Sequence, residues 1–353
     1  MTAADPSSQH SPLTTREGWM KFVLTTSSDF TIVPIEHKAA FNGLQRDEYE
    51  RDKLEYHARL VVATPALWQT VHAGQRLTLL NCGQISARRE LVVIGGAGTG
   101  KTTAIAQLGK HHDLQLRRRL GVGKNLLPVV YVALPPGATA KMITAEFARF
   151  LGIPLTKSFN HINITNAVCD VLCDLGTSLV LIDEIHNIAL TTRNSKEASK
   201  HVKHLAERIP ATFVYSGIDT VGLSNEGSGN QIASRFTAIT TSNFAYGNNE
   251  QREAWNALIA TFEDALRLDH HQPGSLVRLA GYLHNRTGGM IGSLSHLIRA
   301  AAIESILTGT EKITKKVFDQ IQLDHAAETN RKQNHPRPQR STRDHRDDSG
   351  EAT

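Results

Sequence analysis

Four short runs of the chain are apolar at nearly every position, and stretches with helical periodicity separate them. They occupy residues 91–94, 129–134, 179–182 and 212–215, and a weaker run follows at 236–241. Near-continuous apolar runs of this length are typical of strands that are covered on both faces, as in a parallel sheet flanked by helices. Because strands and helices alternate, the pattern predicts right-handed crossovers and an α/β core.

After Gly247 the strand pattern stops and only helical periodicity remains. The first helical pattern carries apolar residues at spacings of three and four, namely Trp255, Leu258, Ile259, Phe262 and Leu266. Two further patterns, at 276–283 and 291–301, and a candidate N-cap at Thr314 predict three more helices. We therefore expect a small helical domain over residues 249–325.

The remaining segments complete a four-part layout. Helical patterns begin near Asp47 and are interrupted by Pro65, before the first strand. The polar first fifteen residues and the tail after residue 325, which has a basic middle, are expected to be disordered. The predicted parts are a partly disordered N-terminal extension (1–46), an α/β core with its N-terminal helices (47–248), the helical domain (249–325) and a disordered tail (326–353).

Composition narrows the class of protein. With 353 residues the chain can form two folded units, and its 40% hydrophobic and 21% charged residues are typical of globular proteins. No apolar stretch reaches the roughly 18 residues of a membrane helix, and the first residues lack the features of a signal peptide. Three cysteines indicate a reducing compartment, so we expect a cytoplasmic protein. The net charge of +5 is compatible with a polyanionic partner.

A glycine-rich turn follows the first strand and opens a helix. It fits G-x-x-x-x-G-K-[ST], and the residues concerned are Gly95, Gly96, Ala97, Gly98, Thr99, Gly100, Lys101, Thr102 and Thr103. Glycines let the backbone wrap a phosphate chain, so that N–H groups point inward, and the helix N-terminus adds a positive dipole. The motif predicts that Lys101 reaches the β- and γ-phosphates of ATP, with the Thr102 hydroxyl on Mg²⁺.

Two acids end the strand at 179–182. Asp183 is expected to hold Mg²⁺, and Glu184 to polarise the attacking water. A polar residue, Ser216, ends the next strand, where it could lie between the acids and the γ-phosphate as a sensor or could merely cap a turn. Arg235 follows the fourth strand, and an arginine there could reach a neighbouring subunit's γ-phosphate or simply form a surface ion pair.

Histidines and cysteines elsewhere carry no metal signature. The pairs His111-His112 and His270-His271 have no partner ligands at metal spacing and are interpreted as solvated surface. Cys169 and Cys173 are four residues apart on a predicted helix, and they are interpreted as buried small hydrophobic residues.

In order and spacing these motifs resemble the AAA+ ATPases, and more closely the TniB/TnsC group of ATP-dependent regulators of DNA transposition. The resemblance covers roughly residues 48–325, and it includes the segment 287–292, which is similar to the group's helical-lid signature. It implies a P-loop AAA+ core with a parallel sheet and a C-terminal helical lid. It also implies that ATP and Mg²⁺ are bound, and that ATP-bound copies form a ring or filament on duplex DNA. Further implied partners are a transposase and a target-selection protein, with hydrolysis disassembling the complex.

The resemblance has one departure and leaves the DNA contacts open. Many AAA+ proteins carry a second sensing arginine at the start of the lid helix, where this chain has Gly292, and Arg299 lies two turns further on. Contacts to DNA phosphates would be independent of sequence. The candidates are Lys141, Lys157, Arg193, Lys196, Lys200 and Lys203. A solvated helix face explains the charged segment 193–208 as well, and the same two interpretations apply to the arginine run 117–119.

Other functions fit the motifs less well. A DExH-type helicase would match residues 183–186 but needs a second RecA-like domain, for which too few residues remain. An AAA+ replication initiator or helicase loader usually carries a helix-turn-helix after the lid, where this chain has a polar tail. A non-catalytic ATP-binding module would not need Lys101, Asp183 and Glu184 together, and no N-K-x-D segment indicates a GTPase.

Overall fold

The five predicted strands are confirmed and form one parallel sheet. We describe a computed structural model of the chain, which describes residues 11–25, 30–121, 125–155, 160–188, 193–218 and 235–323. The strands are β1 (Glu90–Gly95), β2 (Val129–Ala133), β3 (Leu179–Asp183), β4 (Thr212–Gly217) and β5 (Phe236–Thr241). Their order in the sheet is β2-β3-β4-β1-β5, and every pairing is parallel. The central strands are fully buried, which explains their continuous apolar runs.

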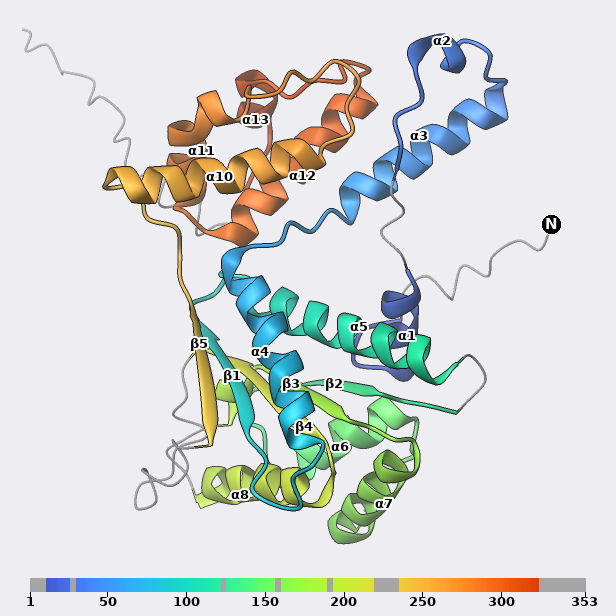
Figure 1. The fold of residues 1–353 in the computed structure, drawn as a ribbon, viewed down its shortest axis with the longest axis vertical. Helices are drawn as coiled ribbons and strands as arrows, with labels where there is room; N and C mark the ends of the chain where they lie inside the picture. The colour runs from blue at the N-terminus through green and yellow to red at the C-terminus, as the bar shows by residue number, and fades with distance from the viewer. Residues whose placement is uncertain are drawn as a thin grey trace, which may run out of the picture.

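Helices cover both faces of this sheet (Figure 1). On one side lie α4 (Pro65–Asn81) and α5 (Lys101–Leu120), and on the other lie α6 (Ala140–Leu151), α7 (His161–Asp174) and α8 (Arg193–Arg208). The C-cap of α6 is Gly152, with a left-handed φ of 71°. The α/β class with a P-loop-type parallel sheet is therefore confirmed.

The C-terminal part is a helical lid with its own hydrophobic core. It consists of α10 (Asn249–Ala265), the 3₁₀ turn η3 (Val277–Leu279), α11 (Ala280–Thr287), α12 (Ile291–Leu307) and α13 (Lys315–Gln320). The predicted Thr314 cap is present, because its side chain accepts from the backbone of Val317 at 3.4 Å. Trp255, Phe262 and Phe318 are buried together in the lid core.

The N-terminal helices divide between the two cores. Helix α1 (Arg16–Leu24), which was not among the predicted elements, packs on α5 and buries Trp19 completely. After the short α2 (Ile35–Lys38), α3 (Gly43–Ala58) packs on α12 of the lid. The layout with boundaries at 47 and 249 stays a prediction, but α3 contributes to the lid core. The residues expected to be disordered at both ends lie largely outside the described residues.

Two interpretations of single side chains are wrong. One side chain of each histidine pair is shielded from solvent: His112 is buried and bonds to the Ser178 hydroxyl at 2.8 Å, and the His271 side chain, 6% exposed, bonds to the Glu263 carboxylate at 3.0 Å. Cys173 is exposed, whereas Cys169 is buried as expected. Within the ranges that the structure describes, no three His, Cys, Asp or Glu side chains form a possible metal cluster. In the same ranges, no helix has the length and apolar character to cross a membrane.

A buried ion-pair cluster joins α3 to the lid. Lys53 is 1% exposed, and its ammonium lies 2.6 Å from Glu311 Oε2 and 3.1 Å from Asp269 Oδ2. Lys38 also contacts Asp269, at 2.5 Å, so two ammonium groups balance the charge of the two carboxylates. Ion pairs this well buried are costly to break from one side, since the remaining charge then has no partner.

We predict that Lys53→Ala lowers the free energy of unfolding by about 3–5 kcal/mol, because Glu311 loses its ammonium partner while Asp269 keeps only Lys38. Urea unfolding followed by tryptophan fluorescence measures this. The matched control is Arg51→Ala on the same helix, where the exposed pair with Glu48 spans 3.6 Å and is worth about 1 kcal/mol or less. Equal effects of the two substitutions would contradict a structural role for the cluster.

Candidate active site

The glycine-rich turn links β1 to α5 at the carboxyl edge of the sheet. Gly98 and Gly100 have φ values of 73° and 87°, which residues with a Cβ rarely adopt. Gly100 is the N-cap of the 20-residue helix α5 and provides no side-chain cap, so the first N–H groups of α5 remain available for an anion. Thr102 and Thr103, on the first turn, are exposed. This geometry is that of a phosphate-binding loop.

Lys101 begins α5 and folds back over the turn. Its ammonium donates to the carbonyl oxygen of Gly96 at 2.7 Å, and the residue is only 8% exposed. Burial lowers the pKa of Lys101, while the nearby carboxylates of Asp183 and Glu184 act in the opposite direction. A lysine ammonium has three donors, so the one that Gly96 accepts leaves capacity for phosphate oxygens.

Asp183 ends β3 and is held by three hydrogen bonds. Its Oδ1 accepts from the Ser216 hydroxyl and from the backbone N–H of Glu184, the latter at 2.9 Å. Its Oδ2 accepts from the Tyr131 hydroxyl at 2.8 Å. Burial, and then the negative charge of Asp183, raise the pKa of Tyr131, so this hydroxyl keeps its proton and remains a donor. Asp183 itself is 3% exposed.

Glu184 adopts an unusual backbone conformation beside Asp183. Its φ of 58° is in the left-handed region, where a non-glycine residue is strained by about 1–3 kcal/mol. It precedes the 3₁₀ turn η2 (Ile185–Asn187), and its carboxylate lies 3.2 Å from His186 Nε2. The side chain keeps 44% of its surface exposed, so it can contact a water molecule at the site. Such strain is common at functional sites, and the catalytic role of Glu184 stays a prediction.

Ser216 lies between the loop strand and the acidic strand. It is opposite Val93 of β1, and the preceding Tyr215 is opposite Ile182 of β3. The residue is completely buried, and its hydroxyl donates to Asp183. The structure thus gives Ser216 a place in the hydrogen-bond network of Asp183, and its sensor role stays a prediction.

The lid contacts the loop directly. The backbone N–H of Gly292, in the first turn of α12, donates to the carbonyl oxygen of Gly98 at 2.9 Å. A Cβ at position 292 would lie 3.1 Å from that same oxygen, so glycine permits this close approach. Met290 also packs on Gly98, with its sulfur in van der Waals range of the Cβ position. At the position where many AAA+ proteins carry a sensing arginine, this chain thus has a glycine whose backbone contacts the loop.

A cavity of about 200 Å³ lies beside the loop, between core and lid. The linker between α3 and α4, the loop residues Gly100 and Thr103, and one face of α12 line it. On that face Gly292, Ser295 and Arg299 follow each other at helical spacing. Arg299 also donates to the carbonyl oxygen of Ala58, which ties the lid to the end of α3.

Strand β5 supports the loop from the other side. The hydroxyls of Thr99 and Thr241 are 2.7 Å apart, and Thr241 Oγ1 also lies 3.1 Å from the carbonyl oxygen of Ile94. Thr241 is the last residue of β5, and Arg235 immediately precedes its first residue. Six strand residues at about 3.3 Å each separate the two by about 20 Å, so Arg235 lies at the opposite edge of the sheet from its own loop.

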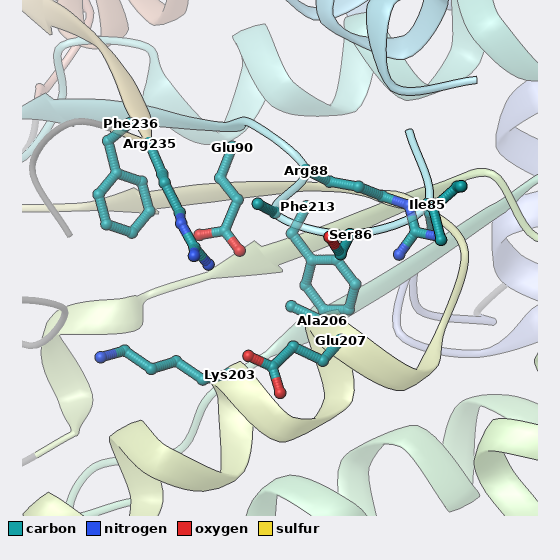
Figure 2. A pocket seen from close by; sticks show the side chains of 12 residues that line it. Ile85, Ser86, Arg88, Glu90, Lys203, Ala206, Glu207, Phe213, Arg235 and Phe236 are labelled. Atoms are coloured by element: carbon teal, nitrogen blue, oxygen red, sulfur yellow. The ribbon is translucent and has the colours of Figure 1, made fainter. Parts of the chain in front are cut away.

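Arg235 is exposed beside a pocket of about 530 Å³ at that opposite edge. Figure 2 shows its guanidinium and the Glu90 carboxylate pointing into the pocket, with Lys203 and Glu207 on α8 facing them. Burial raises the pKa of Glu90 to about 7, although a hydrogen bond from Tyr215 and the charges of Arg235 and Lys203 lower it. The structure thus presents Arg235 on a surface that is remote from its own nucleotide loop.

The predicted DNA-contacting residues do not form one cluster with the loop. Lys196 and Lys200 are exposed on α8, and Lys203 on the same helix lines the pocket beside Glu90. Lys141 is exposed on the first turn of α6. Arg193 begins α8, its side chain is not among those described, and Lys157 lies outside the described residues.

The residues present fit Mg²⁺ with a nucleotide. Thr102, which is exposed, supplies a hydroxyl at the N-terminus of α5. The Asp183 carboxylate accepts three hydrogen bonds, and among the described residues its Oδ2 accepts only from Tyr131. Oxygen ligands of this kind are those that Mg²⁺ prefers. When bound, Mg²⁺ neutralises charge on the phosphate oxygens.

Sequence reasoning did not find several of these residues. Tyr131 and Thr241 contact the site from segments that carry no motif, and Trp19 packs on Tyr131. Tyr131 had one available signal, because a tyrosine inside a continuous apolar strand needs a partner for its hydroxyl. The partners of Trp19 and Thr241 are distant in sequence and had no such signal.

Comparisons with solved structures show which fold this is. The chain is similar to the Aeropyrum pernix ORC2 protein in its ADPNP–ADP complexes, with 14% identity, a TM-score of 0.54 and coverage of 74% of this chain and 68% of that chain. It is also similar to the ORC1 protein of the same organism in complex with DNA, with 13% identity, a TM-score of 0.55 and coverage of 78% of this chain and 67% of that chain. For Cdc6p from Pyrobaculum aerophilum the identity is 15%, the TM-score is 0.51, and the match covers 73% of this chain and 67% of that chain. At these identities the likeness shows the fold, which is that of the AAA+ ORC/Cdc6 proteins.

No curated protein matches the chain. A family model does, and its match runs from α4 across the whole five-stranded sheet to the residues that precede the lid. That segment holds the glycine-rich turn, the acidic end of β3 and Arg235. Through residues 73–246 the chain belongs to the family described as "Bacterial TniB protein", with an AAA+ core.

Proposed function

We propose that the protein is an ATP-hydrolysing regulator of DNA transposition, which assembles on duplex DNA and links target selection to transposase recruitment. One observation carries the ATPase part: the loop after β1 and the acids after β3 meet at one edge of the sheet, separated only by β4. The family match and the AAA+ fold support the regulatory part. The protein would act in the cytoplasm.

The residues would divide the chemistry as follows. The loop residues from Gly95 to Thr103 bind the phosphates through backbone N–H groups, and Lys101 adds a charge-assisted hydrogen bond. Thr102 and Asp183 would hold Mg²⁺. Glu184 is the general base that orients and polarises the attacking water, and its partly exposed carboxylate beside His186 suits this role.

Hydrolysis would need a neighbouring subunit. Arg235 is about 20 Å from its own loop along β5, yet an exposed arginine at the edge of the sheet can reach the γ-phosphate held by the next copy. A planar guanidinium stabilises the charge that develops on the transferred phosphoryl group. The site is therefore complete only in a ring or filament, and ATP holds the copies together until hydrolysis releases them.

The DNA and protein partners follow from the same assembly. Sequence-independent contacts to duplex DNA would come from lysines and arginines, with Lys141, Arg193, Lys196, Lys200 and Lys203 as candidates. A filament or ring on DNA presents repeated surfaces, on which a transposase and a target-selection protein can bind.

A replication initiator or helicase loader is the second candidate. The likeness to the ORC and Cdc6 structures favours it, because the ORC1 structure in question is a complex with DNA. Electron microscopy with ATP, with and without duplex DNA of arbitrary sequence, separates the two: a DNA-centred assembly on any duplex favours the transposition regulator. Origin-specific binding favours the initiator. A DExH helicase needs two RecA-like domains, whereas the described ranges hold one five-stranded sheet.

The loop generates the first functional prediction. Lys101→Ala should weaken ATP binding by about 10- to 100-fold, since a hydrogen bond to a charged group is worth about 1.5–3 kcal/mol. A titration with a fluorescent ATP analogue measures this. Lys110→Ala is the matched control, because Lys110 lies on the same helix but bonds to the Thr25 carbonyl at 2.5 Å. Unchanged affinity in Lys101→Ala would refute the site.

Glu184→Gln should bind ATP normally but hydrolyse it about 10²- to 10⁴-fold more slowly, because it cannot accept the proton of the attacking water. The ATP-bound assembly should persist. Phosphate release and size-exclusion chromatography with ATP measure both effects. Glu146→Gln, on α6 and paired with Arg149, is the control. Hydrolysis at the wild-type rate in Glu184→Gln would show that Glu184 is not the base.

Arg235→Ala should bind ATP as a monomer but lose about 10³-fold or more of its assembly-dependent turnover. Mixing makes the test sharp: Glu184→Gln subunits retain Arg235, and Arg235→Ala subunits retain Glu184. If Arg235 acts on a neighbour, the mixture should recover turnover that neither variant has alone. A mixture as slow as its components, or full turnover of Arg235→Ala at all protein concentrations, would exclude a shared site.

A further inference from the structure

The hydrogen bonds around Asp183 leave it little freedom. An ionised carboxylate can accept at about four positions. On Asp183, Oδ1 accepts from the Ser216 hydroxyl and the Glu184 N–H, and Oδ2 accepts from the Tyr131 hydroxyl. Among the described residues no other donor contacts this carboxylate, so one acceptor position remains, and it is on Oδ2. The hydroxyl of Tyr131 therefore decides how that last position is oriented.

Tyr131 is in turn held by the N-terminal helix α1. The rings of Trp19 and Tyr131 are stacked, with centroids 6.0 Å apart and planes 10° apart. Both residues are buried, Trp19 completely. Since a stacked indole blocks rotation of the phenol ring away from β3, the position of α1 limits where the Tyr131 hydroxyl can lie.

Specific contacts hold Trp19 itself. Its indole N–H donates to Asp113 Oδ2 on α5 at 3.0 Å, and Arg117 binds the other oxygen of Asp113. Gly109 of α5 leaves the space for the indole, because a Cβ there would lie 2.6 Å from Trp19 Cη2 and 2.7 Å from Leu181 Cδ1. The indole thus sits in a place that α5 and β3 shape for it.

We propose that Tyr131 is a positioning residue for Asp183 and that Trp19 holds Tyr131 in place, so that helix α1 belongs to the site that binds Mg²⁺ with the nucleotide. This inference rests on the proposed function, in which Asp183 holds Mg²⁺. The chain of contacts runs from residue 19 through residue 131 to residue 183 and joins three segments that no sequence motif connects. Residues that hydrogen-bond to a metal-binding group orient that group, and their loss typically lowers metal affinity by about 10- to 100-fold.

The test measures metal dependence rather than activity. Binding of a fluorescent, non-hydrolysable ATP analogue is titrated at a series of Mg²⁺ concentrations, and the Mg²⁺ midpoint is compared between variants. Tyr131→Phe, which removes only the hydroxyl, should raise the midpoint by about tenfold or more. Nucleotide binding in EDTA should remain that of the wild type. Trp19→Phe should shift the midpoint in the same direction by a smaller factor, since it keeps a ring but loses the bond to Asp113.

Two matched controls separate positioning from general stability. Tyr215→Phe removes an equally buried hydroxyl that bonds to a carboxylate, that of Glu90, at the opposite edge of the sheet. Trp255→Phe removes an equally buried indole N–H, which bonds to the Ala280 carbonyl in the lid at 2.9 Å. Both should lower the melting temperature, and neither should move the Mg²⁺ midpoint.

A midpoint in Tyr131→Phe within twofold of the wild type overturns the proposal, and so does an equal shift in Tyr215→Phe. If Tyr131→Phe does not fold, the fluorescence emission of Trp19 is measured instead, in a Trp68→Phe/Trp255→Phe variant where Trp19 is the only tryptophan. A change of emission when Mg²⁺ joins the bound nucleotide supports the proposal, and none overturns it. If the wild type binds no nucleotide at all, the proposed function itself fails. If the wild type binds nucleotide but the Mg²⁺ midpoint does not move in Tyr131→Phe, only the positioning role fails.

Discussion

The nucleotide site depends on the register in which β4 pairs with its two neighbours. Val93 of β1 lies opposite Ser216, and Ile182 of β3 lies opposite Tyr215. Side chains alternate along a strand, so a shift of one residue would turn Ser216 away from Asp183 and bury Tyr215 against the wrong face. The phosphate loop and the acidic strand end come from segments about eighty residues apart, and this register brings them to one edge. Packing on both faces of the sheet enforces it.

The sequence was sufficient wherever the signal is local. Near-continuous apolar runs marked four of the five strands, because strands covered on both faces have no polar side to interrupt them, and a weaker run marked the edge strand β5. The loop from Gly95 to Thr103 and the acids at Asp183 were evident from short motifs whose backbone requirements are strict. The lid helices were predictable from periodicity, since each buries one face against the same small core.

Long-range contacts were beyond this reasoning. Helix α1 forms because Trp19 finds a place on α5 more than eighty residues away, which no local pattern encodes. Helix α3 packs with the lid through the buried ammonium of Lys53, a residue type that usually marks the surface. His112 is buried for a similar reason, because Ser178 supplies a polar partner from a distant segment. In each case a tertiary partner compensates a polar group that the sequence alone assigns to solvent.

Strand β5 has a consequence for how copies of the protein sense one another. One end of β5 is tied to the loop through Thr241, and Arg235 precedes its other end, so one short strand joins the loop to the residue that we propose acts on a neighbouring copy. Backbone pairing with β1 along its whole length makes this strand stiff. A displacement that a bound nucleotide imposes at Thr99 would therefore be transmitted along β5 to Arg235, and in the proposed assembly it would couple one nucleotide site to the next.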